Sequence, residues 1–281
     1  MIIFSILLDL IFEEPPEKIH PVAFMGIIGK RLYKKYSNNL KYFIVGMMSL
    51  ILEIAFWGIL IYFIQKVNII IIKNIILIYI LKTTFSIKSL YRHVERCKTN
   101  DLNELKRNVS YIVSRNTNDL DKNHLYSAAI ESLSENINDS ITAPLFYYLL
   151  FGIYGSIIYR VVNTYDALFG YRNAKYEWYG KFCARLDDVL NYIPARITAL
   201  IISFFNLKGA FNYIKKYGRI KVNSTYPMSA FAGVLGLGFE KEGVYKFSGK
   251  LPEIEDLNRA LKLYKKVVFL ILTFVILGEI I

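Results

Sequence analysis

Two long apolar blocks lying almost back to back are the strongest constraint on this chain. Residues 42–64 read YFIVGMMSLILEIAFWGILIYFI, and residues 67–87 read VNIIIIKNIILIYILKTTFSI. A bilayer core needs about 20 mostly apolar residues in a helix, so the pair predicts a hairpin of two membrane-spanning helices. The segment 266–281 is mostly apolar after Lys266 and is a third predicted span.

Two further apolar blocks are too short to cross a bilayer simply. The block 141–158 contains Pro144, Gly152 and Gly155, and the block 195–207 has 13 residues. Proline and glycine commonly break a helix at membrane depth where the backbone lines a buried cavity. We therefore expect both blocks to be re-entrant, bent or buried within a helix bundle.

Composition and periodicity set the fold class. Of the 281 residues, 54% are hydrophobic, and no sustained alternation of polar and apolar residues indicates a barrel. The predicted class is all-α: a polytopic helical membrane protein with large polar helical loops, residues 1–281 forming one membrane-embedded domain. The net charge of +12 comes from basic residues spread beside apolar segments. These are typical of cytoplasmic flanks and build no basic helix or zinc module, so nucleic acid is not an expected partner.

The first polar cluster lies in SAAIESLSENINDSITAP, residues 127–144. In an α-helix, Glu131, Glu135 and Asp139 would follow at i, i+4 and i+8 and share one face. Three like charges in a row destabilise an isolated helix, and a divalent metal or a cationic partner would offset the repulsion. The alternative is the solvated face of an amphipathic helix.

The second cluster is RLDDVLNYIPAR, residues 185–196. Asp187, Asp188 and Asn191 fall within one turn of a helix, and their oxygens suit Mg²⁺ that holds a phosphate. The arginines at the two ends could contact phosphate oxygens with their forked donors. Pro194 should end or kink the helix nearby. The alternative is a set of ion pairs on a helix surface.

The third cluster is RVVNTYDALFGYRNAKY, residues 160–176. Asn163, Thr164 and Asp166 could cap a helix. The mixture of amide, carboxylate, aromatic and basic residues around Gly170 is more typical of a binding loop, which is the interpretation we favour.

Together these strings resemble one family, adenosylcobinamide-phosphate synthase, the integral-membrane cobalamin-biosynthesis protein of the CbiB/CobD family. The matching strings lie at residues 9–26, 114–120, 131–146, 159–180 and 184–196 and so span nearly the whole chain. The chain departs from the family pattern at Asn116, where the family usually has Asp, and at Ser140, where it often has Gly. A third departure is at 221–225, where a Ser-Pro-Asn-Ala-Gly element has become KVNST.

The resemblance implies an ATP-dependent ligase that joins the free carboxylate of adenosylcobyric acid to the amine of aminopropanol phosphate. It implies Mg²⁺ as cofactor, a corrinoid and the amine as substrates, and a multi-pass position in the cell membrane. Because ATP and corrinoid are cytoplasmic, the polar regions 88–140 and 159–194 should both face the cytoplasm. Nucleotide preference, the state of the amine before coupling, the number of spans and any homo-oligomer stay open.

Within that resemblance we assign roles residue by residue. The metal ligands are Glu131, Glu135, Asp187 and Asp188. The catalytic carboxylates are Asp139, Asp166 and Asp188, either of the first two serving as the base. The substrate and phosphate contacts are Arg115, Asn136, Asn163, Tyr171, Arg172, Arg185, Asn191 and Arg196. The two acidic clusters should converge on one cavity, since each supplies too few ligands for Mg²⁺ alone.

Two other classes of protein remain as alternatives. A Mg-dependent intramembrane prenyltransferase would use two Asp-rich helices, but this chain lacks a full Asp-x-x-x-Asp repeat. A transporter could use Glu53 and Lys73 inside the apolar blocks, but the polar motifs lie in loops, whereas transporters place their sites at mid-membrane.

Overall fold

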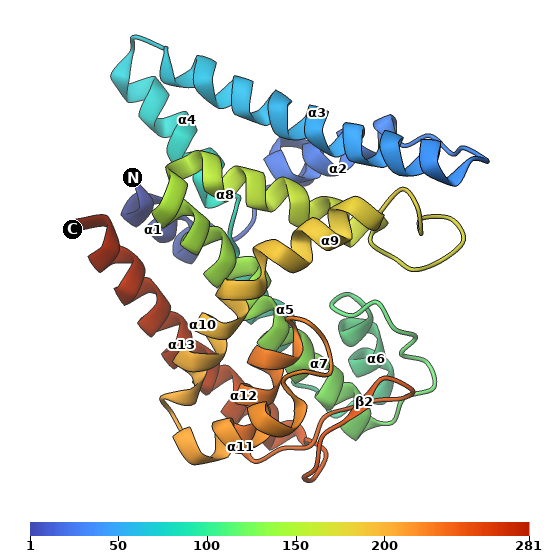
Figure 1. Ribbon diagram of the computed structural model, residues 1–281. Helices are drawn as coiled ribbons and strands as arrows, with labels where there is room; N and C mark the ends of the chain where they lie inside the picture. The colour runs from blue at the N-terminus through green and yellow to red at the C-terminus, as the bar shows by residue number, and fades with distance from the viewer. Residues whose placement is uncertain (281) are drawn as a thin grey trace. The chain divides into compact units, whose positions relative to one another are not determined.

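The computed structural model describes residues 1–280 and divides the chain into two compact units (Figure 1). Unit 1 contains Met1–Ser86, Ala143–Asn191 and the residues from Val275, and unit 2 contains Ile87–Thr142 and Tyr192–Phe274. Nearly all the regular structure is helical, and the sheet described is one two-stranded ribbon. The all-α class is confirmed, while the single-domain organisation stays a prediction.

Unit 1 consists of helices from three separate stretches of the chain. Its elements are α1 (Ile2–Phe12), the 3-10 helix η1 (Glu17–Ile19), α2 (Pro21–Leu32), α3 (Asn39–Gln65), α4 (Ile70–Lys82), α8 (Ala143–Phe169) and α9 (Lys181–Leu190). The turn between α3 and α4 makes the helical hairpin that sequence predicts (Figure 1). However, α4 has 13 residues and is therefore only about 20 Å long, shorter than the predicted span 67–87.

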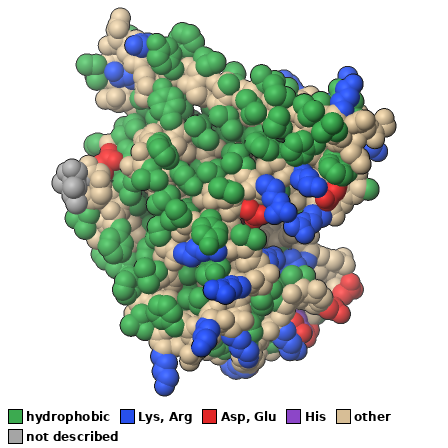
Figure 2. Space-filling model, in the orientation of Figure 1, with side chains coloured by type: hydrophobic (Ala, Val, Ile, Leu, Met, Phe, Trp, Pro, Cys, Tyr) green, Lys and Arg blue, Asp and Glu red, His purple; other side chains and the backbone are tan. Residues whose placement is uncertain are grey.

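Helix α3 is apolar on every side and yet largely exposed. It has 27 residues, about 40 Å of helix, and only 33% of its most apolar 18-residue stretch is buried. Met48, Leu52, Phe56 and Phe63 all present large apolar side chains on its surface. Figure 2 shows hydrophobic side chains spread over this helix. A helix that is apolar all round belongs in a core or a membrane, and a core helix would be buried.

The helical run Lys122–Phe169 is the second segment long and apolar enough to cross a membrane, but it is not straight. Within α8, Phe151 and Gly152 leave the helical conformation, Gly152 with φ of 60° and ψ of −152°. The chain then folds back, so that the rings of Tyr147 and Tyr159 stack with centroids 5.6 Å apart. Gly155 permits this approach, because a Cβ there would lie 2.2 Å from the Tyr147 carbonyl oxygen. Whether this bend is re-entrant in a bilayer stays a prediction.

A buried lysine joins α1 and α4. The Lys82 ammonium lies 3.3 Å from the Asp9 carboxylate and 2.9 Å from Glu14, and the Lys82 and Asp9 side chains are both buried. His20, whose Nδ1 accepts the backbone N–H of Val22 and so caps α2, lies 2.8 Å from Glu14. Burial raises the pKa of Glu14, but the bond to His20 and the charge of Lys82 outweigh it and lower the pKa to about 2.

Unit 2 surrounds a buried helix. Its elements are α5 (Lys88–Glu95), α6 (Leu102–Ser110), α7 (Lys122–Ile137), the π-helical turn η2 (Asn138–Thr142), α10 (Tyr192–Ser203), α11 (Leu207–Tyr217), α12 (Thr225–Leu235), β1 (Glu240–Lys241), β2 (Tyr245–Lys246) and most of α13 (Ile254–Ile280). Asp121 caps α7 by accepting the His124 backbone N–H, and every residue from Leu125 to Ser134 is buried. The predicted span 266–281 is thus the later part of a longer helix, α13.

Replacing Glu14 by glutamine tests the buried lysine network. A carboxylate whose pKa is lowered from 4.5 to about 2 stabilises the fold above pH 4.5 and loses this effect as the pH falls toward 2. We expect Glu14→Gln to remove roughly 2–3 kcal/mol at pH 7 and to flatten the acid side of the stability curve. Thermal unfolding in detergent from pH 2.5 to 7 measures both effects. The exposed Glu17→Gln is the control, and equal acid sensitivity in parent and Glu14→Gln would contradict the assignment.

Candidate functional site

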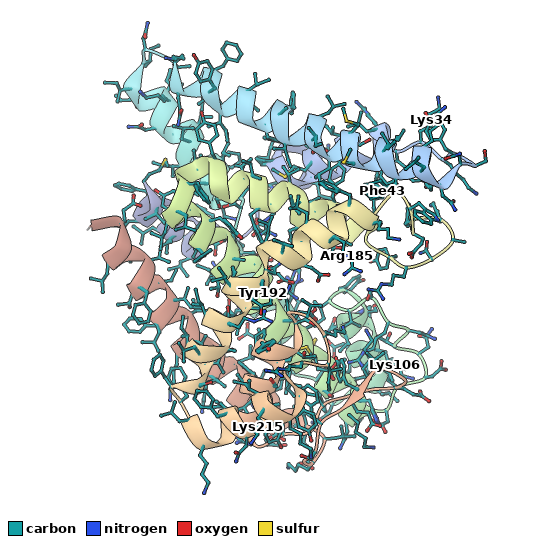
Figure 3. The ribbon with its side chains drawn as sticks, in the orientation of Figure 1. Lys34, Phe43, Lys106, Arg185, Tyr192 and Lys215 are labelled. Carbon is teal, nitrogen blue, oxygen red and sulfur yellow. The ribbon has the colours of Figure 1, made fainter. Side chains whose placement is uncertain are left out.

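A polar cavity opens in unit 1 between α9 and the loop that follows α8. Its volume is about 230 Å³, and it is lined by four residues singled out in the sequence: Tyr171, Arg172, Arg185 and Asp188. Lys181 and Tyr176 line it as well. Figure 2 shows Lys and Arg side chains gathered with acidic ones over α9, and Figure 3 labels Arg185 on this helix.

Helix periodicity explains which α9 side chains reach the cavity. Lys181, Arg185 and Asp188 follow at i, i+4 and i+7 and therefore share one face of α9. Sequence reasoning named Arg185 and Asp188 but missed Lys181, which the same helical spacing could have identified. The predicted break near Pro194 is also confirmed, because α9 ends at Leu190 and the proline lies in the first turn of α10, where it interrupts no helical hydrogen bond.

The loop before α9 is held by aromatic packing and backbone bonds. The Tyr42 hydroxyl donates to the Lys175 carbonyl oxygen at 2.7 Å. The Phe169 ring packs edge-on against Tyr176 and Tyr179, with centroids 5.5 and 5.0 Å apart. The Asn173 side chain accepts the backbone N–H groups of the second and third residues after it. These contacts fix the backbone that carries Tyr171 and Arg172.

Asp187 lies on α9 beside the end of α8. Its carboxylate accepts hydrogen bonds from the amides of Asn163 and Asn191, at 3.4 and 2.9 Å, and the buried Tyr159 hydroxyl donates to Asn191 at 2.9 Å. Burial, followed by repulsion from Asp166, raises the pKa of Asp187 to about 7. The side chains predicted from two separate strings, 159–180 and 184–196, therefore meet.

The third cluster is not a loop at its start. Asn163, Thr164 and Asp166 lie inside α8, and the Thr164 hydroxyl donates to the Arg160 carbonyl oxygen one turn earlier. The loop begins only at Gly170. The helix continues because the apolar residues between the polar ones face the core of unit 1, so both the capping alternative and a binding loop over the whole segment are wrong.

The donor set around Asp187 fits Mg²⁺ held together with a phosphate. Within residues 1–280 no three His, Cys, Asp or Glu side chains gather as a complete metal cage. Mg²⁺ is usually bound by one or two carboxylates, waters and substrate phosphates, so a complete cage is not needed. Asp166, Asp187 and Asp188 repel one another, and a cation would relieve that repulsion.

Glu131 in unit 2 is buried and fully engaged by protein donors. Its carboxylate receives Arg115 at 2.9 Å, the Tyr245 hydroxyl at 2.6 Å and the Ser127 hydroxyl at 2.5 Å. Arg115 also donates to the backbone carbonyl oxygen of Glu240. This network ties α7 to the β-ribbon and leaves Glu131 bonded to protein groups. Its predicted role as a metal ligand stays a prediction, as does that of Arg115 as a phosphate contact.

The rest of the first cluster does not keep α-helical spacing. The α-helix ends at Ile137, and Asn138 to Thr142 form a π-helical turn, in which the Thr142 hydroxyl donates to the Ile137 carbonyl oxygen five residues earlier. Glu135 and Asp139 are both partly exposed, and the shared acidic face stays a prediction. Asn136 donates to the Ser132 carbonyl oxygen at 2.9 Å.

Arg196 is enclosed between two aromatic rings of unit 2. Its guanidinium lies 3.6 Å from the Tyr192 ring centroid and 4.1 Å from that of Tyr226. It donates to the side chain of Asn223 and to the carbonyl oxygens of Tyr192 and Val222. These contacts join α10 to the start of α12, so this arginine has a clear structural role beside its predicted phosphate contact.

A second, more open polar cavity of about 510 Å³ lies in unit 2. Lys106, Arg107, Arg115 and Asn116 are among its lining residues, and Figure 3 labels Lys106. The predicted residues thus fall into two groups, one in each unit. The convergence of the two acidic clusters on one cavity, which would join the groups, stays a prediction.

Comparison with known proteins gives a consistent family signal. The model of the family described as "CobD/Cbib protein" matches residues 2–267. A Pyrococcus furiosus protein named "Probable cobalamin biosynthesis protein CobD" is 48% identical, with 97% of this chain and 96% of the relative covered. Proteins of the same name from Thermococcus kodakarensis and Methanocaldococcus jannaschii are 48% and 36% identical, covering 92% and 99% of this chain and 88% and 96% of their own lengths. No solved structure matches.

The variant Glu131→Gln tests whether the Glu131 carboxylate supports the fold or binds a metal ion. Removing the charge leaves the partly buried Arg115 without its ionised partner, and we expect Glu131→Gln to cost roughly 3 kcal/mol of stability in the absence of Mg²⁺. The neighbouring Glu135→Gln, one turn along α7 and half-exposed, should change stability by less than about 1 kcal/mol. Thermal unfolding in a chelating buffer measures both. An unchanged melting temperature for Glu131→Gln, with weakened Mg²⁺ binding, would favour the metal role.

Proposed function

The chain belongs to the CobD/Cbib protein family, and we propose that it forms an amide bond in cobalamin biosynthesis at the expense of ATP. The substrates would be adenosylcobyric acid, which supplies a carboxylate, and aminopropanol phosphate, which supplies an amine. The observation that best supports a phosphate-handling site is the unit 1 cavity, where Arg172, Lys181 and Arg185 face Asp188.

The basic side chains of this cavity suit the phosphates of a nucleotide. Arginine donates in a fixed fork that matches phosphate oxygens, and a lysine adds a compact positive charge. Arg172 and Arg185 would hold and orient the transferred phosphoryl group, with Lys181 beside them. Asp187 and Asp188 would hold Mg²⁺, which when bound shields the negative charge that builds up on phosphate oxygens.

The reaction balances in two steps. The corrinoid carboxylate attacks the terminal phosphorus of ATP, which forms an acyl phosphate and releases ADP. The amine then attacks the acyl carbon, the C–N bond forms and phosphate leaves. The amine must lose a proton in this second step, and Asp166 or Asp139 would accept it.

The bilayer is the proposed surrounding of α3 and α1. Both helices expose large apolar side chains along their length, among them Phe4 and Phe12 on α1 and Phe56 on α3. Exposed apolar area of this extent marks a membrane or protein interface. We propose a multi-pass membrane protein whose ATP site faces the cytoplasm, where its substrates are.

The variant Asp188→Asn tests whether the Asp188 carboxylate is needed for turnover. Asp188→Asn keeps the shape but removes the charge, and we expect turnover to fall about 100-fold or more with the melting temperature unchanged. The assay measures ATP consumption that requires both corrinoid acid and aminopropanol phosphate. Glu255→Gln, exposed on α13, is the charge-matched control. ATP consumption by the parent that is independent of either substrate would contradict the proposed reaction.

Cysteine labelling tests the orientation. Single cysteines are introduced at Asn118 and Asn173, both exposed, in a background without Cys97 and Cys183. We expect a membrane-impermeant maleimide to react with both only after the cells are permeabilised. Reaction at either position in intact cells would refute a cytoplasmic site on that loop.

A further inference from the structure

Three basic side chains from distant parts of unit 2 meet around Tyr245. The Lys221 ammonium lies 5.8 Å from the centroid of the Tyr245 ring. Lys241 is the cross-strand partner of Tyr245 in the β-ribbon, so the two side chains project from the same face. Arg115 shares the Glu131 carboxylate with the Tyr245 hydroxyl. We call Arg115, Lys221 and Lys241 the basic cluster.

The basic cluster has more positive charge than the surrounding carboxylates neutralise. Arg115 is paired with Glu131 at 2.9 Å, while the ammonium groups of Lys221 and Lys241 form no ion pair with any carboxylate in residues 1–280. Burial, and then the charges of Lys221 and Arg115, hold the pKa of Lys241 below its usual range; Glu135 opposes this shift without cancelling it. Like charges held together this way favour an anion between them.

We propose that the basic cluster binds the phosphate group of a phosphate monoester. Two lysines without a carboxylate partner match a monoester, which carries a charge of about −1.5 to −2 at pH 7. The basic cluster lies in unit 2, whereas the cavity proposed for the nucleotide lies in unit 1. Lys221 belongs to the segment where the chain departs from the family pattern, so the sequence resemblance did not point to it. The assignment of the basic cluster to the amine substrate rests on the proposed function, whereas the inference that the cluster binds a phosphate group does not.

Direct binding to the purified full chain in detergent tests the site. Isothermal titration compares 1-amino-2-propanol O-phosphate, the same amino alcohol without phosphate, inorganic phosphate and Mg-ATP. The variants are Lys221→Met, Lys241→Met and the double variant. Lys215→Met on α11 is the control, because Lys215 is exposed. Lys241→Arg keeps the charge and should retain binding.

We expect each methionine variant to weaken binding of the phosphate ester about tenfold, and the double variant about 100-fold. Mg-ATP affinity should change less than about twofold, and the control should match the parent. If inorganic phosphate binds with the same dependence on the two lysines, the phosphate group alone is recognised, which also supports the site. Unchanged ester affinity in the double variant, or an equal loss for Lys215→Met, overturns it.

Two results separate this inference from the proposed function. If the chain binds the ester through the two lysines but forms no amide bond, the proposed reaction is wrong and the phosphate site is still supported. A parallel loss of Mg-ATP and ester affinity in the double variant would assign the cluster to the nucleotide and so overturn the inference, with amide formation unaffected as a proposal. Melting temperatures of all variants confirm that binding is compared between folded proteins.

Discussion

A charged side chain that leaves water needs an opposite charge or a set of hydrogen bonds, and this requirement organises both units. Lys82 satisfies it with Asp9 and Glu14, and Glu131 satisfies it with Arg115 and two hydroxyl groups. In these places the partner comes from the chain itself and the charge supports the fold. Around Asp187 two amide hydrogen bonds fill this role, while burial and the nearby Asp166 and Asp188 raise the pKa of the carboxyl group.

Sequence reasoning singled out four of the residues that line the unit 1 cavity, because their signal is local. Arg185 and Asp188 share a helix face by their spacing alone, and Tyr171 and Arg172 lie just before that helix. The long apolar helix α3 could also be predicted from the sequence, because a run of about 20 apolar residues is typical of a membrane-spanning helix.

What the sequence did not reveal depends on contacts between distant residues. The Tyr245 hydroxyl, 114 positions later in the chain, donates a hydrogen bond to Glu131, and no pattern within either segment predicts that bond. The helix changes from α to π geometry after Ile137, and the sequence there is equally compatible with a continuous α-helix. Asp166 lies in a helix because neighbouring apolar residues are buried, so packing decided between loop and helix there.

The interleaving of the two units has a consequence for synthesis on the ribosome. The chain passes from unit 1 to unit 2 and back again, and each unit receives residues from α13. The Tyr148 hydroxyl of unit 1 donates a hydrogen bond, at 3.0 Å, to Glu279 near the end of α13. Neither unit can therefore finish folding while the nascent chain is still being translated through α13, and the early helices must wait, partly assembled, for the last one. A stalled or truncated product would leave both units incomplete at once and would be a ready substrate for membrane proteases.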